Sequence, residues 1–139
     1  MPFVGREALH RMGRILIVDD EPQACQILSR LIRHLGHETA WKTAGADALT
    51  YLDATPVDLL ILDVMMPGMD GMEVLRRLRA DPKTEKLPVV MFSAVADRNF
   101  IDEAIRKGAT DYWVKASFDF NQLKTRIEGL VPPPEGNNN

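Results

Sequence analysis

Two hydrophobic periods alternate along this chain, and their alternation restricts the fold more than any other feature. Short apolar runs rich in β-branched residues predict strands, and the segments between them carry apolar residues at helical spacing. The predicted strands are 14–19, 37–42, 57–63, 87–94 and 110–115, and the predicted helices are 21–36, 45–55, 71–81, 98–109 and 118–130. The first helix is expected to bury one stripe made of Ala24, Ile27, Leu28, Leu31, Ile32 and Leu35, and the last helix one made of Phe120, Leu123, Ile127 and Leu130.

This order of elements predicts an α/β fold with a parallel sheet, because parallel neighbours need crossover connections that helices usually supply. The runs at 14–19, 57–63 and 87–94 are apolar almost throughout, as expected of strands covered by helices on both faces. We therefore predict one domain over residues 14–131. Residues 1–13 are expected to be an N-terminal arm or a non-native extension, and residues 132–139 a flexible C-terminal tail.

Composition excludes several classes of protein. The net charge of the 139-residue chain is −3 and no basic block occurs, so direct nucleic-acid binding is not expected. No apolar run approaches the roughly 18 residues of a membrane span, and the N-terminus does not resemble a signal peptide. The single cysteine, Cys25, cannot form an intrachain disulfide. These features predict a cytoplasmic protein that does not bind membranes.

Polar residues follow the apolar strands at the points where those strands end. Asp19 and Asp20, Asp63, Ser93 and Lys115 all stand at such positions, although they are far apart in the sequence. Because the carboxyl ends of parallel strands share one edge of a sheet, where α/β folds place their sites, we expect these side chains to converge.

Three converging carboxylates suggest a magnesium site. Two like charges this close repel by roughly 1 to 4 kcal/mol, depending on screening, and a divalent cation offsets that repulsion. Mg²⁺ prefers oxygen ligands and can neutralise charge during phosphoryl transfer. Lys115 adds a positive charge, and the Ser93 hydroxyl can donate a hydrogen bond to a phosphoryl oxygen. Asp63, alone at the end of the central strand, is the candidate phosphoryl acceptor.

The motifs at these strand ends resemble those of the receiver domain of two-component response regulators. They are "VDDE" (18–21), "LILDVMMPGMDG" (60–71), "FSA" (92–94) and "GATDYWVK" (108–115). The resemblance covers residues 14–131. It implies a (βα)5 flavodoxin-like three-layer sandwich whose five-stranded parallel sheet has the strand order 2-1-3-4-5, in a single-domain response regulator.

The resemblance also implies a role for each site residue. Asp63 would accept a phosphoryl group from the phosphohistidine of a sensor histidine kinase or a phosphotransfer protein. Asp19 and Asp20 would hold Mg²⁺ together with Asp63 and the backbone carbonyl of Met65. The domain would signal through this modification and would lose the phosphoryl group by autodephosphorylation, without acting as an enzyme on external substrates.

Ser93 and Lys115 would contact the phosphoryl group, and Tyr112 would be the aromatic switch residue that turns inward when the Ser93 hydroxyl moves. The switch would alter the face formed by the fourth helix, the fifth strand and the fifth helix, and a downstream effector protein would bind there. Dimerisation on activation is left open.

Two departures from the family pattern carry expectations of their own. Ala116 follows Lys115 where relatives usually have proline, often after a cis bond. A cis bond before alanine costs ~2.5 to 4 kcal/mol, so we expect either a trans bond with a rearranged loop or a strained cis bond.

Met65 and Val95 stand where relatives often have polar side chains that orient water. Their apolar character predicts slow hydrolysis of the acyl phosphate.

Other functions fit the sequence less well. A flavin or nucleotide binder needs a phosphate loop where this chain has "DDEP" (19–22). A phosphatase of the haloacid dehalogenase type resembles this chain in using an aspartate nucleophile, but that aspartate belongs to a D-x-D motif, whereas this chain has "DVM" (63–65). A pseudo-receiver, a protein-interaction module not controlled by phosphorylation, stays open because of Ala116.

Overall fold

The computed structural model describes residues 13–131, so the predictions for the remaining terminal residues lie outside the described part. Its five strands form one parallel sheet in the order β2-β1-β3-β4-β5, which confirms the predicted fold class and strand order. The strands are β1 (Arg14–Val18), β2 (Glu38–Lys42), β3 (Leu59–Leu62), β4 (Val89–Ser93) and β5 (Asp111–Val114). The helices are α2 (Pro22–His34), α3 (Gly45–Ala54), α4 (Gly71–Ala80), α5 (Arg98–Arg106) and α6 (Leu123–Glu128), with a 3₁₀ turn, η1 (Phe120–Gln122), before α6.

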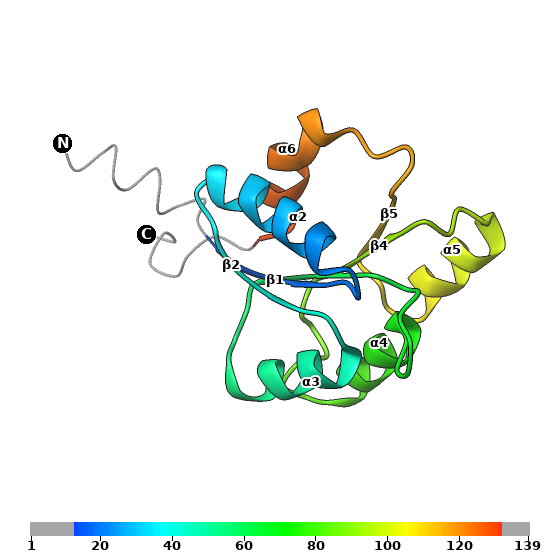
Figure 1. Cartoon of the computed structure of the whole chain (residues 1–139). Coiled ribbons are helices and arrows are strands. Elements are labelled where there is room, and N and C mark those ends of the chain that lie inside the picture. Colours follow the sequence, from blue (N-terminus) through cyan, green and yellow to red (C-terminus); the bar gives the residue numbers. More distant parts are fainter. Residues whose placement is uncertain (1–12, 132–139) are drawn as a thin grey trace, which may run out of the picture.

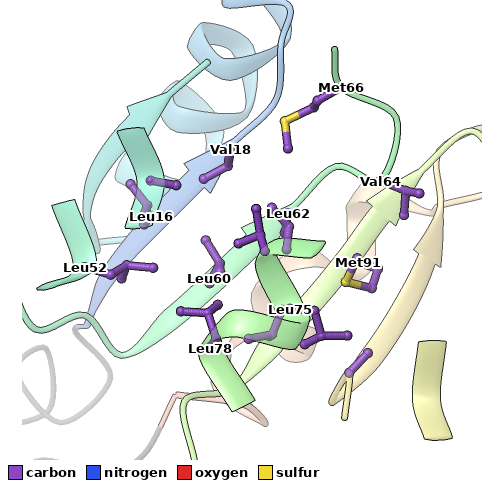
Figure 2. Close-up of a cluster of buried hydrophobic side chains, with 14 of the residues drawn as sticks. Leu16, Val18, Leu52, Leu60, Leu62, Val64, Met66, Leu75, Leu78 and Met91 are labelled. Atoms are coloured by element: carbon purple, nitrogen blue, oxygen red, sulfur yellow. The ribbon is translucent and has the colours of Figure 1, made fainter. Parts of the chain in front are cut away.

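Helices cover both faces of the sheet, with α2 and α6 on one side and α3 and α4 on the other (Figure 1). Successive side chains of each strand point to opposite faces. On β1, Leu16 and Val18 therefore join the core under α3, α4 and α5, whereas Ile15 and Ile17 join the core under α2 and α6. Figure 2 shows the first of these cores, where β3 contributes Leu60 and Leu62.

The buried face of α2 differs from the predicted stripe. Cys25, Leu28 and Ile32 pack on the sheet, whereas Ile27 is 59% exposed and Leu31 is 40% exposed. The sequence offers two neighbouring apolar stripes on this helix, and only one of them can face β1. Ile27 and Leu31 are left on the flank of the helix.

The last helix also starts later than predicted. The Asp119 side chain accepts a hydrogen bond from the backbone N–H of Asn121, which begins the 3₁₀ turn, and α6 proper begins only at Leu123. Leu123 and Ile127 are buried as expected, but Phe120 lies in the turn with 46% of its surface exposed. Its assignment to the buried stripe was wrong.

A close backbone approach places α4 directly against the end of β3. A Cβ atom on Gly71 would lie 2.2 Å from the carbonyl oxygen of Asp63, so only glycine fits there. The Gly71 N–H donates to the carbonyl of Val64, and the Asp70 side chain caps α4 by accepting from the N–H of Glu73. These contacts fix the backbone that follows Asp63. Within residues 13–131, no helix is long and apolar enough to span a membrane.

Candidate functional site: an acidic pocket at the carboxyl edge of the sheet

The candidate residues follow four neighbouring strands and meet at one edge of the sheet. Asp19 follows β1, Asp63 follows β3, Ser93 ends β4 and Lys115 follows β5. The backbone ladder continues through them, because the Asp63 N–H donates to the Val18 carbonyl at 2.8 Å and the Lys115 N–H donates to the Ser93 carbonyl at 2.8 Å. Each side chain is therefore presented from a fixed backbone, which a preorganised site needs.

Three carboxylates lie close enough to share a cation. Asp19, Asp20 and Asp63 each offer an oxygen, and these oxygens all lie within 4.8 Å of one another. Asp19 and Asp63 are almost fully buried, at 5% and 6% exposure, and Asp20 is half-buried. Mg²⁺ takes oxygen ligands and commonly binds through one or two carboxylates plus water. The donor set therefore fits the predicted ion.

Burial perturbs the ionisation of Asp63. The pKa of Asp63 is raised to about 6, first because burial disfavours its charged form and second because the Asp19 carboxylate repels it. The charge of Lys115 and a hydrogen bond from the Met65 backbone N–H act in the opposite direction but do not outweigh these effects. The ionised form of Asp63 is therefore disfavoured in the folded protein, and a bound cation would stabilise it.

The Lys115 ammonium group lies close to the carboxylates of both Asp19 and Asp63. Its Nζ donates to Asp19 Oδ2 at 2.6 Å and lies 3.8 Å from Asp63 Oδ2. Burial acts to lower the pKa of Lys115, but the hydrogen bond to Asp19 and the charge of Asp63 outweigh it, so the pKa is raised. The ammonium group therefore stays charged at neutral pH, within reach of any group that forms on Asp63.

The substitution of alanine for proline leaves the reach of Lys115 intact. No peptide bond in residues 13–131 is cis, so the Lys115–Ala116 bond is trans and the expected alternative of a strained cis bond was wrong. The loop turns immediately, because the Ser117 N–H donates to the Val114 carbonyl at 3.1 Å.

Ser93 and Tyr112 are connected through the segment that follows β4. The Ser93 hydroxyl is fully buried and accepts a hydrogen bond from the Val95 N–H at 3.1 Å, while the Tyr112 hydroxyl donates to the Val95 carbonyl at 2.7 Å. The Tyr112 ring packs edge-on against Phe100 of α5, and burial raises its pKa. Val95 thus links the candidate hydroxyl to the candidate switch residue.

The remaining predicted ligand, the carbonyl of Met65, belongs to the loop directly after Asp63. The Met65 side chain is 63% exposed, while its N–H faces the Asp63 carboxylate. Its role as a metal ligand, like the roles of the other site residues, stays a prediction.

An aromatic cluster that was not predicted from the sequence lies beside the acids. Phe92, Trp113, Phe118 and Phe120 pack together, with Trp113 stacked on Phe118 at 4.6 Å between ring centroids and Phe92 edge-on to the other three. The Lys115 Nζ lies 5.6 Å from the Phe92 centroid, within cation–π range. The only signal for the cluster was the F-x-F spacing at 118 and 120.

Comparisons with known proteins agree with this geometry. Residues 15–128 match the response regulator receiver domain family. The chain is 42% identical over 124 residues to the chemotaxis protein CheY of Pseudomonas aeruginosa, covering 88% of this chain and 99% of that protein. It is 40% identical to the DNA-binding response regulator MtrA of Mycolicibacterium smegmatis over 85% of this chain, but it spans only half the length of MtrA.

A solved structure gives the same result for the fold. The chemotaxis protein CheY4 of Vibrio cholerae superimposes with a TM-score of 0.79 at 27% identity, covering 86% of this chain and 99% of that one.

Proposed function

Since this chain belongs to the response regulator receiver domain family, we propose that it accepts a phosphoryl group on Asp63 from a sensor histidine kinase or a phosphotransfer protein. Receiver domains of this CheY-like kind act in two-component systems. One observation supports the proposal most directly. Lys115 lies within ion-pair distance of two buried carboxylates, those of Asp19 and Asp63, at the end of the central strand.

In the proposed transfer, an oxygen of the ionised Asp63 carboxylate attacks phosphorus, and the bond from phosphorus to the imidazole nitrogen of the donor breaks. Phosphoryl transfer needs little covalent chemistry from the protein beyond positioning and charge stabilisation. Mg²⁺, held by Asp19, Asp20, Asp63 and the carbonyl of Met65, would neutralise charge on the phosphoryl oxygens.

Lys115 and Ser93 would stabilise the phosphorylated state. Lys115 already donates to Asp19 and lies 3.8 Å from Asp63, so a short shift brings its ammonium group to a phosphoryl oxygen. Ser93 would exchange its contact with the Val95 N–H for a hydrogen bond to the same group.

That exchange would reach the surface through Tyr112. Because Tyr112 donates to the Val95 carbonyl, movement of the segment after Ser93 changes the position that Tyr112 prefers. The face formed by α5, β5 and α6 would change with it and would bind the downstream effector. The named relatives differ in output, since one is a chemotaxis protein and another a DNA-binding regulator. Binding of a downstream effector and the cytoplasmic location stay predictions, and dimerisation on activation stays open.

The decisive experiment combines Mg²⁺ with acetyl phosphate, or with beryllofluoride as a phosphoryl analogue. Intact mass should show one added phosphoryl group, and the fluorescence of Trp113 should change, because Trp113 stacks in the cluster next to Lys115. Both responses should be lost in Asp63→Asn and retained in Asp53→Asn, an exposed acid on α3. Absence of Mg²⁺ binding and of both responses in the unmodified chain would instead support the pseudo-receiver alternative.

A further inference from the structure

A cavity of about 250 Å³ adjoins the proposed phosphoryl acceptor on the side of α2 and α6. Its far walls are apolar and come from Ile27 and Leu28 of α2, Phe92 of β4 and Phe120 of η1. Its charged lining consists of Asp63 and Lys115, the two groups that would bond to and stabilise the phosphoryl group, together with Asp19 and Glu21. A single concave site thus joins a reactive carboxylate to an apolar surface.

The mouth of the cavity is open to a ligand. Ile27 is 59% exposed and Phe120 is 46% exposed, and these are two of the few large apolar side chains left uncovered in residues 13–131. The Phe120 ring is held in place by edge-on contacts with Phe92 and Phe118, at centroid distances of 6.2 and 5.1 Å. Asp20 does not line the cavity, so part of the acidic cluster lies outside it.

We propose that this cavity receives the apolar acyl group of a small acyl-phosphate donor, so that aromatic acyl phosphates modify Asp63 faster than acetyl phosphate does. The inference rests on the proposed function, because it concerns the donor that uses the same acceptor. In the step, the bond from an Asp63 oxygen to phosphorus forms and the bond from phosphorus to the acyl oxygen breaks. The leaving group departs as a carboxylate, and no proton or further reactant is required.

Charge and size favour this ligand class. Lys115 and a bound Mg²⁺ would provide positive charge for the phosphoryl head. The rest of the lining is apolar except for Asp19 and Glu21, whose carboxylates would repel an anionic body, so the ligand needs an anionic head and an uncharged apolar body. A volume of about 250 Å³ suits one small ring better than the broad face of a helix. Small-molecule sites are typically concave and mostly apolar, with a few polar groups that fix orientation.

The test compares acetyl phosphate with benzoyl phosphate as donors in the presence of Mg²⁺, with Asp63 phosphorylation followed by intact mass. Burial of the phenyl ring should raise kcat/KM by roughly tenfold over acetyl phosphate. The ratio of the two kcat/KM values should fall severalfold in Ile27→Ala and in Phe120→Ala, and should recover in Phe120→Leu. Ile105→Ala removes an exposed apolar side chain from α5 that does not line the cavity, and should leave the ratio unchanged.

Binding without transfer gives a second measurement. Phenacylphosphonate and acetonylphosphonate keep the shapes of the two donors but cannot transfer phosphorus, because a carbon atom replaces the bridging oxygen. In an NMR titration, phenacylphosphonate should bind roughly tenfold more tightly, and this advantage should be lost in Ile27→Ala. Ile27 contributes no ring to the aromatic cluster, so its loss removes a wall of the cavity without removing a ring–ring contact of Phe120.

The outcomes separate this inference from the function on which it rests. If acetyl phosphate labels Asp63 but the ratio is the same in the unmodified chain and both cavity variants, the inference is overturned and the proposed function stands. If Ile27→Ala slows transfer only from a phosphohistidine protein, the cavity serves a protein donor and the inference is again overturned. If neither donor labels Asp63, both ideas fail.

Discussion

Replacing Asp63 with asparagine should make the metal-free protein more stable at neutral pH, although it removes the candidate acceptor. The pKa of Asp63 in the folded protein is raised to about 6, from an ordinary value of 3.8. A raised carboxyl pKa means that the folded state binds the proton more tightly than the unfolded state does. The ionised Asp63 carboxylate therefore lowers the free energy of unfolding. This unfavourable contribution is absent below pH 4, grows as the pH rises to 6, and is complete above that pH.

The size of the effect follows from the shift. About two pKa units correspond to about 3 kcal/mol at pH 7, at 1.36 kcal/mol per unit. Asparagine keeps the shape of the side chain and removes the charge that Asp19 repels. The raised pKa already includes the opposing attraction of Lys115, so about 3 kcal/mol is the upper bound and we expect a gain of roughly 1 to 3 kcal/mol.

Urea unfolding in the presence of EDTA measures this gain directly. The difference in the free energy of unfolding between Asp63→Asn and the unmodified chain should shrink toward zero as the pH falls from 6 to 4. Asp53→Asn serves as the control, because Asp53 is exposed and Lys83 holds its pKa below the ordinary value, so no gain is expected. A gain that is absent at pH 7, or that stays constant down to pH 4, would refute the electrostatic account of the site.

Three other outcomes follow from the same geometry. Phosphorylated protein freed of donor should persist for many minutes to hours, and a lifetime of seconds, measured by phosphate release, would contradict this prediction. Met65→Asn should shorten the lifetime by roughly tenfold or more, because its amide can position the attacking water. Tyr112→Phe should lower the free energy of unfolding by about 1 kcal/mol, because the hydrogen bond to the Val95 carbonyl is lost; a urea titration checks this value. Without bound metal, the ionised fraction of Asp63 should fall as the pH drops through about 6, and an NMR titration of its carboxyl carbon should show that midpoint.

Much of the fold could be predicted because each strand carries its own signal. The apolar run of β3, Leu59–Leu62, is buried at every position, as a central strand covered on both faces must be. The register between neighbours then puts Asp19 and Asp63 side by side, since Val18 pairs with Leu62 one residue earlier. Placing these two residues at one edge required only the knowledge that the strands are parallel.

The errors arise where the outcome depends on contacts between distant segments. Periodicity gave α2 a set of apolar residues at helical spacing, but the set was wider than the face that one helix can bury. Cys25 packs inward while Ile27 and Leu31 do not, and no local signal separates these positions. Phe120 presents the same difficulty, because the position of its ring in η1 depends on the ring of Phe92, which lies far earlier in the sequence on β4.

The alternation of side chains along β4 and β5 connects the site to both faces of the sheet. Ser93 and Tyr112 lie toward α5, and Tyr112 packs on the core beneath α3, α4 and α5. Their neighbours Phe92 and Trp113 pack on the opposite core, with α2 and α6. Lys115 contacts only the second of these groups, since its Nζ donates to Asp19 and lies over the Phe92 ring. A shift of this ammonium group toward a phosphoryl oxygen would change its distance to Phe92, whereas a shift of Ser93 would act on Tyr112 through Val95, so modification of Asp63 would bear on both faces of the sheet.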